Sequence, residues 1–180
     1  MGATARNIEI KARIESLEAV APRAAALADR GPIELLQDDT FFTCERGRLK
    51  LRALSADEGQ LIFYRRPDQA GPKESVFTIS PTGSPETLRE ALWLAYGPSG
   101  RVRKHRTLYL AGRTRIHLDR VEGLGDFLEL EVVLAEGEPA AAGVDEAHRL
   151  MAALGIAPAQ LVEGAYVDLL ATEQGKEQSN

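Results

Sequence analysis

The sequence predicts an α+β fold built around an eight-stranded antiparallel β-barrel with flanking helices. Segments in which polar and apolar side chains alternate recur along the 180 residues, and they outnumber the helical segments, which indicates a chain made chiefly of strands. The connections between these segments are short, and short connections favour antiparallel pairing because parallel neighbours need long crossovers. About eight strands with helices outside them suit a closed or nearly closed barrel.

The N-terminal half begins with one strand and one helix. Residues 7–14 alternate strictly, and one face carries Asn7, Glu9 and Lys11 while the other is apolar, as in a strand with one buried face. Residues 15–29 are rich in Ala, Leu and Glu and predict a helix, which Gly31-Pro32 should end. Four strands are then predicted, over residues 34–44, 47–54, 60–66 and 74–80.

The C-terminal half mixes three more strands with helices. Ser84 is expected to cap a second helix that starts at Pro85 and runs to about Tyr96. The remaining strands are predicted over residues 101–110, 113–121 and 126–135, with a tight hairpin between the first two. Further helices are predicted over residues 144–154 and 158–163, followed by a last apolar segment over residues 165–170. We expect one domain over residues 1–171 and a polar, frayed tail over residues 172–180.

Composition limits the class of function. A net charge of −5 argues against a general nucleic-acid binder, whose affinity needs a basic surface, although a basic pocket can lie inside an acidic shell. Cys44 is the single cysteine, so an intramolecular disulfide and a cysteine-based metal site are excluded. The sequence has neither an apolar run that could span a membrane nor a signal-peptide pattern at its start. A cytoplasmic protein without a membrane partner is therefore expected.

Four pairs of like charges lie two residues apart within alternating segments. They are Lys50-Leu51-Arg52, Lys104-His105-Arg106, Arg113-Thr114-Arg115 and Glu129-Leu130-Glu131. Residues i and i+2 of a strand point to the same face, so each pair directs two charges of one sign to one side of a sheet. Such faces favour a site for a polyanion and a divalent metal. The alternative is an ordinary solvated sheet face of mixed charge.

The residue types in these pairs indicate which chemistry they suit. Glu129 and Glu131 would repel each other side by side and need a cation, protonation or free water. Oxygen ligands suit Mg²⁺ or Mn²⁺ rather than zinc, and arginine and lysine suit phosphate oxygens. His117 by itself is better explained as a hydrogen-bonded structural side chain than as a ligand. No glycine-rich phosphate loop, zinc spacing or nucleophile elbow offers other chemistry.

These motifs together form a recognisable pattern. The opening strand reads Asn7-Ile-Glu9-Ile-Lys11, basic residues follow at Lys50-x-Arg52, at Arg65 before Pro67 and at Lys104-x-Arg106, and the segment from His117 to Glu131 carries Asp119 and both glutamates. From Asn7 to Leu170 the chain resembles the CYTH domain family, also called the triphosphate tunnel metalloenzymes. The sequence of the segment from His117 to Glu131 is most similar to the class IV adenylyl cyclase-like branch of this family.

The resemblance implies a tunnel that holds a triphosphate together with Mg²⁺ or Mn²⁺. The implied metal ligands are Glu9, Asp119, Glu129 and Glu131. The implied phosphate-binding residues are Lys11, Lys50, Arg52, Arg65, Lys104, Arg106 and Arg115, of which Lys11 and Arg106 are expected to be catalytic. Asn7 departs from the family pattern, which has a glutamate there. An amide oxygen can coordinate a cation but brings no negative charge, so a second metal site should be weaker.

Three functions follow as expectations. The first is an adenylyl cyclase that converts ATP into cyclic AMP and pyrophosphate, and the second is a triphosphatase acting on tripolyphosphate or thiamine triphosphate. The third is a non-catalytic sensor of nucleotides or polyphosphate, which Asn7 motivates. The resemblance also leaves a homodimer open.

Overall fold

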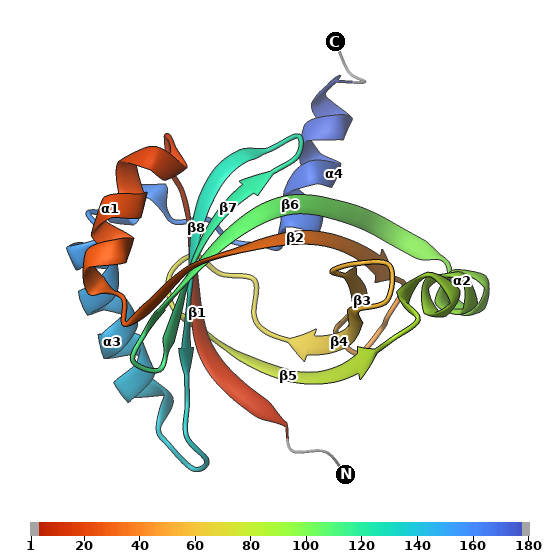
Figure 1. Ribbon diagram of the computed structural model, residues 1–180, viewed down its shortest axis with the longest axis horizontal. Coiled ribbons are helices and arrows are strands. Elements are labelled where there is room, and N and C mark those ends of the chain that lie inside the picture. Colours follow the sequence, from red (N-terminus) through yellow and green to blue (C-terminus); the bar gives the residue numbers. More distant parts are fainter. Residues whose placement is uncertain (1–3, 178–180) are drawn as a thin grey trace.

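Eight antiparallel strands close into a barrel in the computed structural model, which describes residues 4–177 (Figure 1). The strands are β1 (Ala5–Arg13), β2 (Arg30–Phe42), β3 (Arg48–Ala53), β4 (Gly59–Arg65), β5 (Lys73–Thr82), β6 (Pro98–Ala111), β7 (Thr114–Val121) and β8 (Gly125–Val133). Their order around the barrel is β1-β5-β4-β3-β2-β6-β7-β8, and β8 closes onto β1. The predicted fold class is confirmed.

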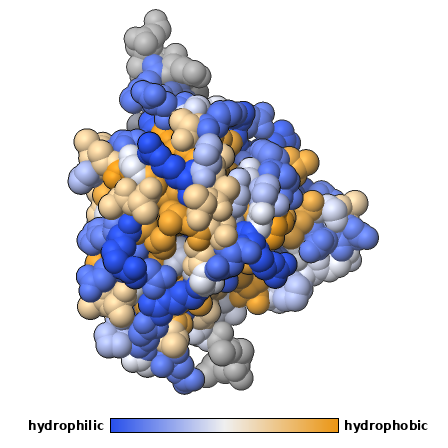
Figure 2. All heavy atoms as spheres, turned by 60° about the vertical axis from the view of Figure 1, so that its left-hand side comes forward, coloured by the Kyte–Doolittle hydropathy of each residue, from blue (hydrophilic) through white to orange (hydrophobic). Residues whose placement is uncertain are grey.

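The helices lie outside the barrel. They are α1 (Leu17–Leu27), α2 (Pro85–Tyr96), α3 (Ala140–Ala153), the single 3-10 turn η1 (Pro158–Gln160) and α4 (Tyr166–Glu177). Helices α1 and α3 cover the flank formed by β1, β7 and β8, whereas α2 packs near β2 and β3 on the opposite side (Figure 1). On the face that carries α1 and α3, hydrophilic residues surround patches of hydrophobic ones (Figure 2).

The main hydrophobic core lies between the barrel wall and the helices, not inside the barrel. Ile8 and Ile10 of β1 and Leu128 and Leu130 of β8 are almost fully buried and belong to this core together with residues of α1 and α3. Helix α3 approaches β1 closely, since a Cβ at Gly143 would lie 2.6 Å from Ile8 Cγ1. Successive residues of a strand point to opposite faces, and the residues that alternate with this core face the barrel interior. They include Asn7, Glu9 and Lys11 of β1 and Glu129 and Glu131 of β8.

Several elements begin earlier than the sequence predicts. Strand β2 starts at Arg30 and already contains Gly31-Pro32, which lies at a register irregularity between Arg30 and Ile33 of the β2–β6 pair. Proline has no N–H for a ladder hydrogen bond, and an irregular position tolerates it. Strand β6 starts at Pro98 rather than at residue 101, and α3 starts at Ala140 rather than at residue 144.

Helix α4 occupies most of the segment for which the sequence predicts a frayed tail. It runs through Glu177, whereas residues 178–180 of the predicted tail, like residues 1–3 of the predicted domain, lie outside the described residues. The Asp168 carboxylate accepts a hydrogen bond from the backbone N–H of Ala165 at 2.8 Å and forms an ion pair with Arg48 at 2.7 Å. Val167 and Leu170 pack against a second apolar cluster. These contacts anchor the first turns, from which a polar helix can continue.

None of the described helices is both long and apolar enough to cross a membrane.

Candidate active site

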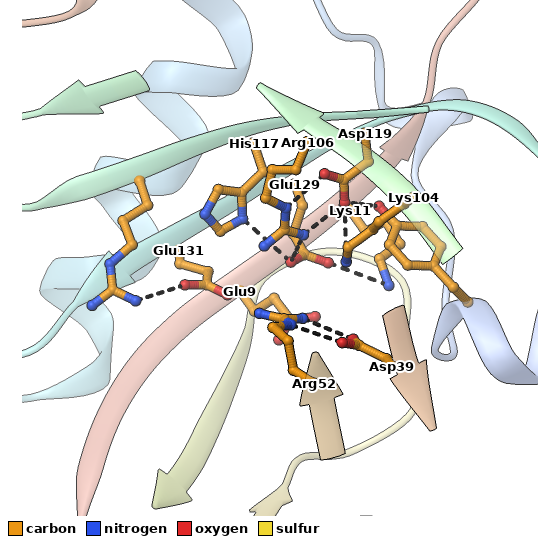
Figure 3. A network of polar contacts seen from close by, with 12 residues as sticks. Glu9, Lys11, Asp39, Arg52, Lys104, Arg106, His117, Asp119, Glu129 and Glu131 are labelled. Atoms are coloured by element: carbon orange, nitrogen blue, oxygen red, sulfur yellow. Dashed lines mark hydrogen bonds and ion pairs between the residues drawn. The ribbon is translucent and has the colours of Figure 1, made fainter. Parts of the chain in front are cut away.

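The barrel encloses a cavity of about 490 Å³ in which charged side chains from most strands converge (Figure 3). The lining cations are Lys11, Lys50, Arg52, Arg66, Lys104, Arg106 and Arg115, and the lining carboxylates are Glu9, Asp39, Glu129 and Glu131. Each predicted pair of like charges on β3, β6 and β8 has both members on the inner face of its strand. The excess of cations over carboxylates makes the interior suitable for an anion.

Arg106 is held by a carboxylate in the barrel wall. Its guanidinium donates two hydrogen bonds of 2.6 Å to Asp119, whose second oxygen also accepts from the Tyr166 hydroxyl at 2.8 Å, with Lys104 Nζ at 3.5 Å. Asp119 is fully buried. Burial alone would raise the pKa of Asp119, but Arg106 and Lys104 outweigh it and keep that pKa below its ordinary value.

These contacts occupy the carboxylate oxygens of Asp119. The resemblance implies a metal ligand, yet both carboxylate oxygens are occupied by cations and a hydroxyl, and Asp119 is not among the residues that line the cavity. In this structure the Asp119 carboxylate fixes the direction of the Arg106 guanidinium. Its role as a metal ligand stays a prediction.

Asp39 holds a second pair of cations in the same way, and sequence reasoning missed it. Its carboxylate lies 2.8 Å from Lys50 Nζ and accepts two hydrogen bonds of 2.8 Å from Arg52. Burial works to raise the pKa of Asp39, but Arg52 and Lys50 lower it well below its ordinary value. The neighbouring Asp38 points outward to Arg101. Because the two aspartates are adjacent, the sequence alone does not identify the one that faces the cavity. The position opposite Arg52 in the β2–β3 register identifies Asp39.

Glu129 lies at the centre of the network. Its carboxylate is 3.4 Å from Lys11 Nζ, 3.3 Å from Arg106 and 3.5 Å from His117 Nδ1. Burial would raise the pKa of Glu129, but these neighbours, Lys11 foremost, lower it well below its ordinary value. Glu9 behaves in the opposite way, because burial and the nearby Glu129 raise its pKa more than Arg66 lowers it. A proton that enters the site is therefore expected to reside on Glu9 before Glu129.

Arg66 replaces the predicted Arg65 as a cation of the cavity. The Arg66 side chain is 2% exposed, lies 3.1 Å from Glu9 Oε1 and donates a hydrogen bond to the carbonyl oxygen of Gly164. Arg65 is exposed and does not line the cavity. The reason is strand alternation, because Ile62, Tyr64 and Arg66 face inward and the residues between them face outward.

The segment that leads into α4 contributes to the cavity wall. Tyr166 and Ala165 line the cavity, and the Tyr166 ring centroid lies 3.9 Å from Lys11 Nζ and 4.8 Å from Lys104 Nζ. Burial lowers the pKa of Lys104 to about 7, with the Arg106 charge acting in the same direction. No charge pattern predicts that Tyr166 lines the cavity, because Tyr166 lies in a short apolar segment far from the barrel strands in sequence.

Three possible metal ligands come together on β7 and β8. His117, Glu129 and Glu131 each offer one ligand atom, and these atoms all lie within 4.8 Å of one another. His117 Nδ1 is buried, and its contact with Glu129 Oε1 at 3.5 Å is too long for a well-formed hydrogen bond, so this nitrogen lacks a close partner among the described residues. Two carboxylates and one imidazole fit a divalent cation. Glu9, a predicted ligand, is not part of this group, and its carboxylate is close to Arg66.

Glu131 and Arg115 lie nearer to solvent than the rest of the network. They are 3.3 Å apart, and the Arg115 side chain is 40% exposed. The cavity wall also has an apolar part, formed by Leu35, Leu54, Phe77, Ile79 and Leu108. Ile79 is 41% exposed, so this part of the wall is open to solvent. The cavity thus combines a charged interior with an apolar entrance.

Known proteins share this architecture. The sequence model of the CYTH domain matches residues 5–166. No curated protein is similar enough in sequence to match the chain. Among solved structures, a Pyrococcus horikoshii protein has a TM-score of 0.78 at 23% identity, with 91% of this chain and 99% of that chain covered.

Two further similar structures carry names that refer to a reaction. One is a Vibrio parahaemolyticus protein named as a candidate adenylate cyclase, with a TM-score of 0.68 at 18% identity over 95% of this chain and 99% of that one. The other is a Hippeastrum protein named in the same way and described as having a dominant triphosphatase activity, with a TM-score of 0.65 at 18% identity over 93% and 96%. At these identities the similarity demonstrates a shared fold.

Proposed function

The chain belongs to the CYTH domain family, and we propose from this premise that it is a divalent-metal-dependent enzyme that acts on a triphosphate bound inside the barrel. One observation carries the proposal, namely the convergence of seven lysine and arginine side chains on a single cavity. Cations that served only solubility would be scattered over the exterior. Burying so many like charges costs free energy unless an anion or fixed carboxylates compensate them.

The side chains of the cavity suit phosphate groups in two ways. Arg52 and Arg106 are oriented by Asp39 and Asp119, so their guanidinium groups need little reorganisation to donate to phosphate oxygens. Lysine side chains act as mobile point charges, and Lys11 is the one at the centre of the site. Lys11 and Arg106 both contact Glu129, and we assign them to offsetting the charge that develops on the leaving group.

The residues that would hold the metal are Glu129, Glu131 and His117, and the donor set fits a divalent ion. When bound, such an ion neutralises phosphate charge and makes the attacked phosphorus more electrophilic. Glu9 lies across the β1–β8 pair from Glu131. Because burial and Glu129 raise its pKa, Glu9 is suited to exchange a proton at the site.

Cyclisation of ATP is the reaction that we place first. In it the ribose 3′-hydroxyl gives up its proton to a base, a role that we assign to Glu9, and its oxygen forms a new bond to the α-phosphorus. The bond from the α-phosphorus to the oxygen that bridges it to the β-phosphate breaks, and pyrophosphate leaves. A nucleoside needs an apolar surface beside the phosphate site, and the wall formed by Leu35, Phe77, Ile79 and Leu108 offers one. Gln37 and Gln60, which also line the cavity, can donate and accept hydrogen bonds from uncharged polar groups.

Hydrolysis of a triphosphate is the second candidate. The similar Hippeastrum structure, described as having a dominant triphosphatase activity, favours it, and the same cations would stabilise the leaving phosphate. A non-catalytic binding protein is the third candidate. Its support is Asn7, which lines the cavity with a buried and unpaired Oδ1 in place of a carboxylate.

Product identification separates these functions. The protein is incubated with ATP, tripolyphosphate or thiamine triphosphate in the presence of Mg²⁺ or Mn²⁺, with a Glu129→Gln variant as the inactive control. Cyclic AMP with pyrophosphate is the expected result, and orthophosphate would replace the cyclase with the triphosphatase. Tight binding of one of these compounds without turnover would favour the non-catalytic binding protein. Absence of both binding and turnover for all three compounds would overturn the proposal.

A further inference from the structure

His117 has an unused imidazole nitrogen at the cavity wall. The side chain is 5% exposed, lines the cavity, and has no hydrogen-bond partner for Nδ1. Glu129 Oε1 lies 3.5 Å from Nδ1, beyond good hydrogen-bond geometry. A buried polar atom without a partner costs free energy, so such an atom in a cavity indicates that something binds there.

The strand register fixes His117 relative to two carboxylates. His117 pairs with Glu129 across β7 and β8, and Arg115 pairs with Glu131 two residues along the same ladder, so both pairs lie on one face. Cross-strand neighbours on one face are close enough for their side chains to share a ligand. The three ligand atoms lie within 4.8 Å of one another, and two ligands on opposite sides of an ion at ~2.1 Å lie ~4.2 Å apart. Small rotamer adjustments therefore suffice to bind one ion.

From this arrangement we infer that His117, Glu129 and Glu131 form a mixed imidazole–carboxylate site that binds Mn²⁺ in preference to Mg²⁺. Both ions accept carboxylate oxygens, whereas an imidazole nitrogen is a ligand that Mg²⁺ avoids and that first-row transition metals accept. The inference deepens the proposed function, because it specifies the metal on which that function depends.

The neighbouring cations do not occupy the ligand atoms completely. Lys11 and Arg106 lie 3.4 and 3.3 Å from Glu129, and Arg115 lies 3.3 Å from Glu131. Each carboxylate has about four lone-pair directions, so these long contacts leave positions for an ion. The shorter carboxylate–cation contacts are instead those of Asp39 with Arg52 and of Asp119 with Arg106, and neither acid belongs to the group of three ligand atoms.

Electron paramagnetic resonance of bound Mn²⁺ tests the inference without any turnover. Pulsed measurements detect a ¹⁴N nucleus coordinated to Mn²⁺, and protein labelled with ¹⁵N-histidine must shift that signal to the ¹⁵N frequencies. The unaltered chain can be used for this step, so folding of a variant is not at issue. We expect one histidine nitrogen coupled to the bound ion. Bound Mn²⁺ without a nitrogen coupling, or no bound Mn²⁺, would overturn the inference.

Two variants then assign the nitrogen. His117→Gln should abolish the nitrogen coupling and weaken Mn²⁺ binding by about 10–100-fold, while Mg²⁺ binding changes by less than about 3-fold. His105→Gln is the matched control, because His105 is 44% exposed and contacts Glu34 instead of the cavity residues. A coupling that survives in His117→Gln but disappears in His105→Gln would overturn the inference, as would equal preference of the unaltered chain for the two ions.

The outcome for the metal site is distinguishable from the outcome for the proposed function. A nitrogen coupling without turnover of any triphosphate would refute the enzyme and uphold the metal site. Turnover supported equally by Mg²⁺ and Mn²⁺, with no nitrogen coupling, would refute the metal site and uphold the enzyme.

Discussion

Replacing Asp119 by asparagine should destabilise the protein strongly even when no metal or substrate is bound. The substitution keeps the shape of the side chain but removes the charge that faces Arg106 at 2.6 Å and Lys104 at 3.5 Å. It also leaves the Tyr166 hydroxyl without its anionic acceptor. If Asp119 were instead a ligand in a metal-free site, removal of its charge would relieve repulsion between carboxylates and stabilise the apo protein.

The expected size of the effect follows from burial. Asp119 and Lys104 are at most 3% exposed in their side chains, and Arg106 is 5% exposed. Removing one partner of a buried ion pair costs about 3–5 kcal/mol, because an uncompensated charge stays buried. For a chain of this length, that loss corresponds to a decrease in Tm of about 6–20 °C.

Thermal and urea unfolding in the presence of EDTA measure this difference. Glu131→Gln is the matched control, because its carboxylate makes one 3.3 Å contact with the partly exposed Arg115, and it should cost about 1 kcal/mol or less. The pKa of Asp119 is lowered on folding, so its stabilising effect is present above its unfolded pKa. The gap between wild type and Asp119→Asn should therefore narrow below about pH 4. A gap under about 1 kcal/mol at pH 7 would refute the positioning role.

Three more predictions concern the cavity. Arg66→Gln should weaken triphosphate binding at least about tenfold, whereas Arg65→Gln should not, and equal effects in a binding titration would contradict the inward placement of Arg66. The pKa of Lys104 is about 7, and a bound anion raises it. Triphosphate binding should therefore take up a proton at pH 8 but not at pH 6, and the affinity for triphosphate should decrease as the pH rises from 6 to 8. Calorimetry in buffers of different ionisation enthalpy measures this uptake, and Lys104→Arg, which stays charged, should abolish it. Tyr166→Phe should reduce the free energy of unfolding by about 1.5–3 kcal/mol, and no change in chemical unfolding would show that the hydroxyl does not stabilise Asp119.

Strand alternation explains which parts of the cavity the sequence reveals. Lys50 with Arg52, and Glu129 with Glu131, lie in uninterrupted alternating segments, so the face shared by each pair follows from spacing alone. Alternation becomes ambiguous where two like residues are adjacent. Arg65 and Arg66 occupy such a position before the turn at Pro67. The resemblance implies Arg65, but a shift of one residue exchanges the two faces, and Arg66 is the one that lines the cavity.

Other features depend on contacts between segments that are distant in the sequence. The contacts of the Asp119 oxygens with Arg106 and Tyr166 are one example. Tyr166 itself follows η1 and reaches the cavity only because the segment before α4 folds against β1, where Val162 N–H donates to the carbonyl oxygen of Lys11 at 3.0 Å. No periodicity in the sequence encodes such an approach.

The carboxylates that orient the cations also oppose anion binding, which leads to a prediction about Asp39. It lies 2.8 Å from Lys50 and Arg52 and compensates both charges when the cavity is empty. A phosphate about 5 Å away would be repelled by Asp39 with about 3 kcal/mol at an effective dielectric constant of about 20. Stability of the empty barrel and affinity for the anion are thus in conflict at this residue.

Asp39→Asn should therefore lower Tm in the absence of ligand, because two buried cations lose their partner, and should bind tripolyphosphate at least about tenfold more tightly once folded. Asp38→Asn is the control, because Asp38 forms ion pairs with three arginines on the outside of the same strand. It should change stability modestly and leave tripolyphosphate binding unaltered. Isothermal titration calorimetry and ligand-dependent thermal shifts give both quantities. Weaker binding by Asp39→Asn would mean that the orientation of Arg52 contributes more to anion binding than the removal of a negative charge does, and the electrostatic conflict inferred here would be wrong.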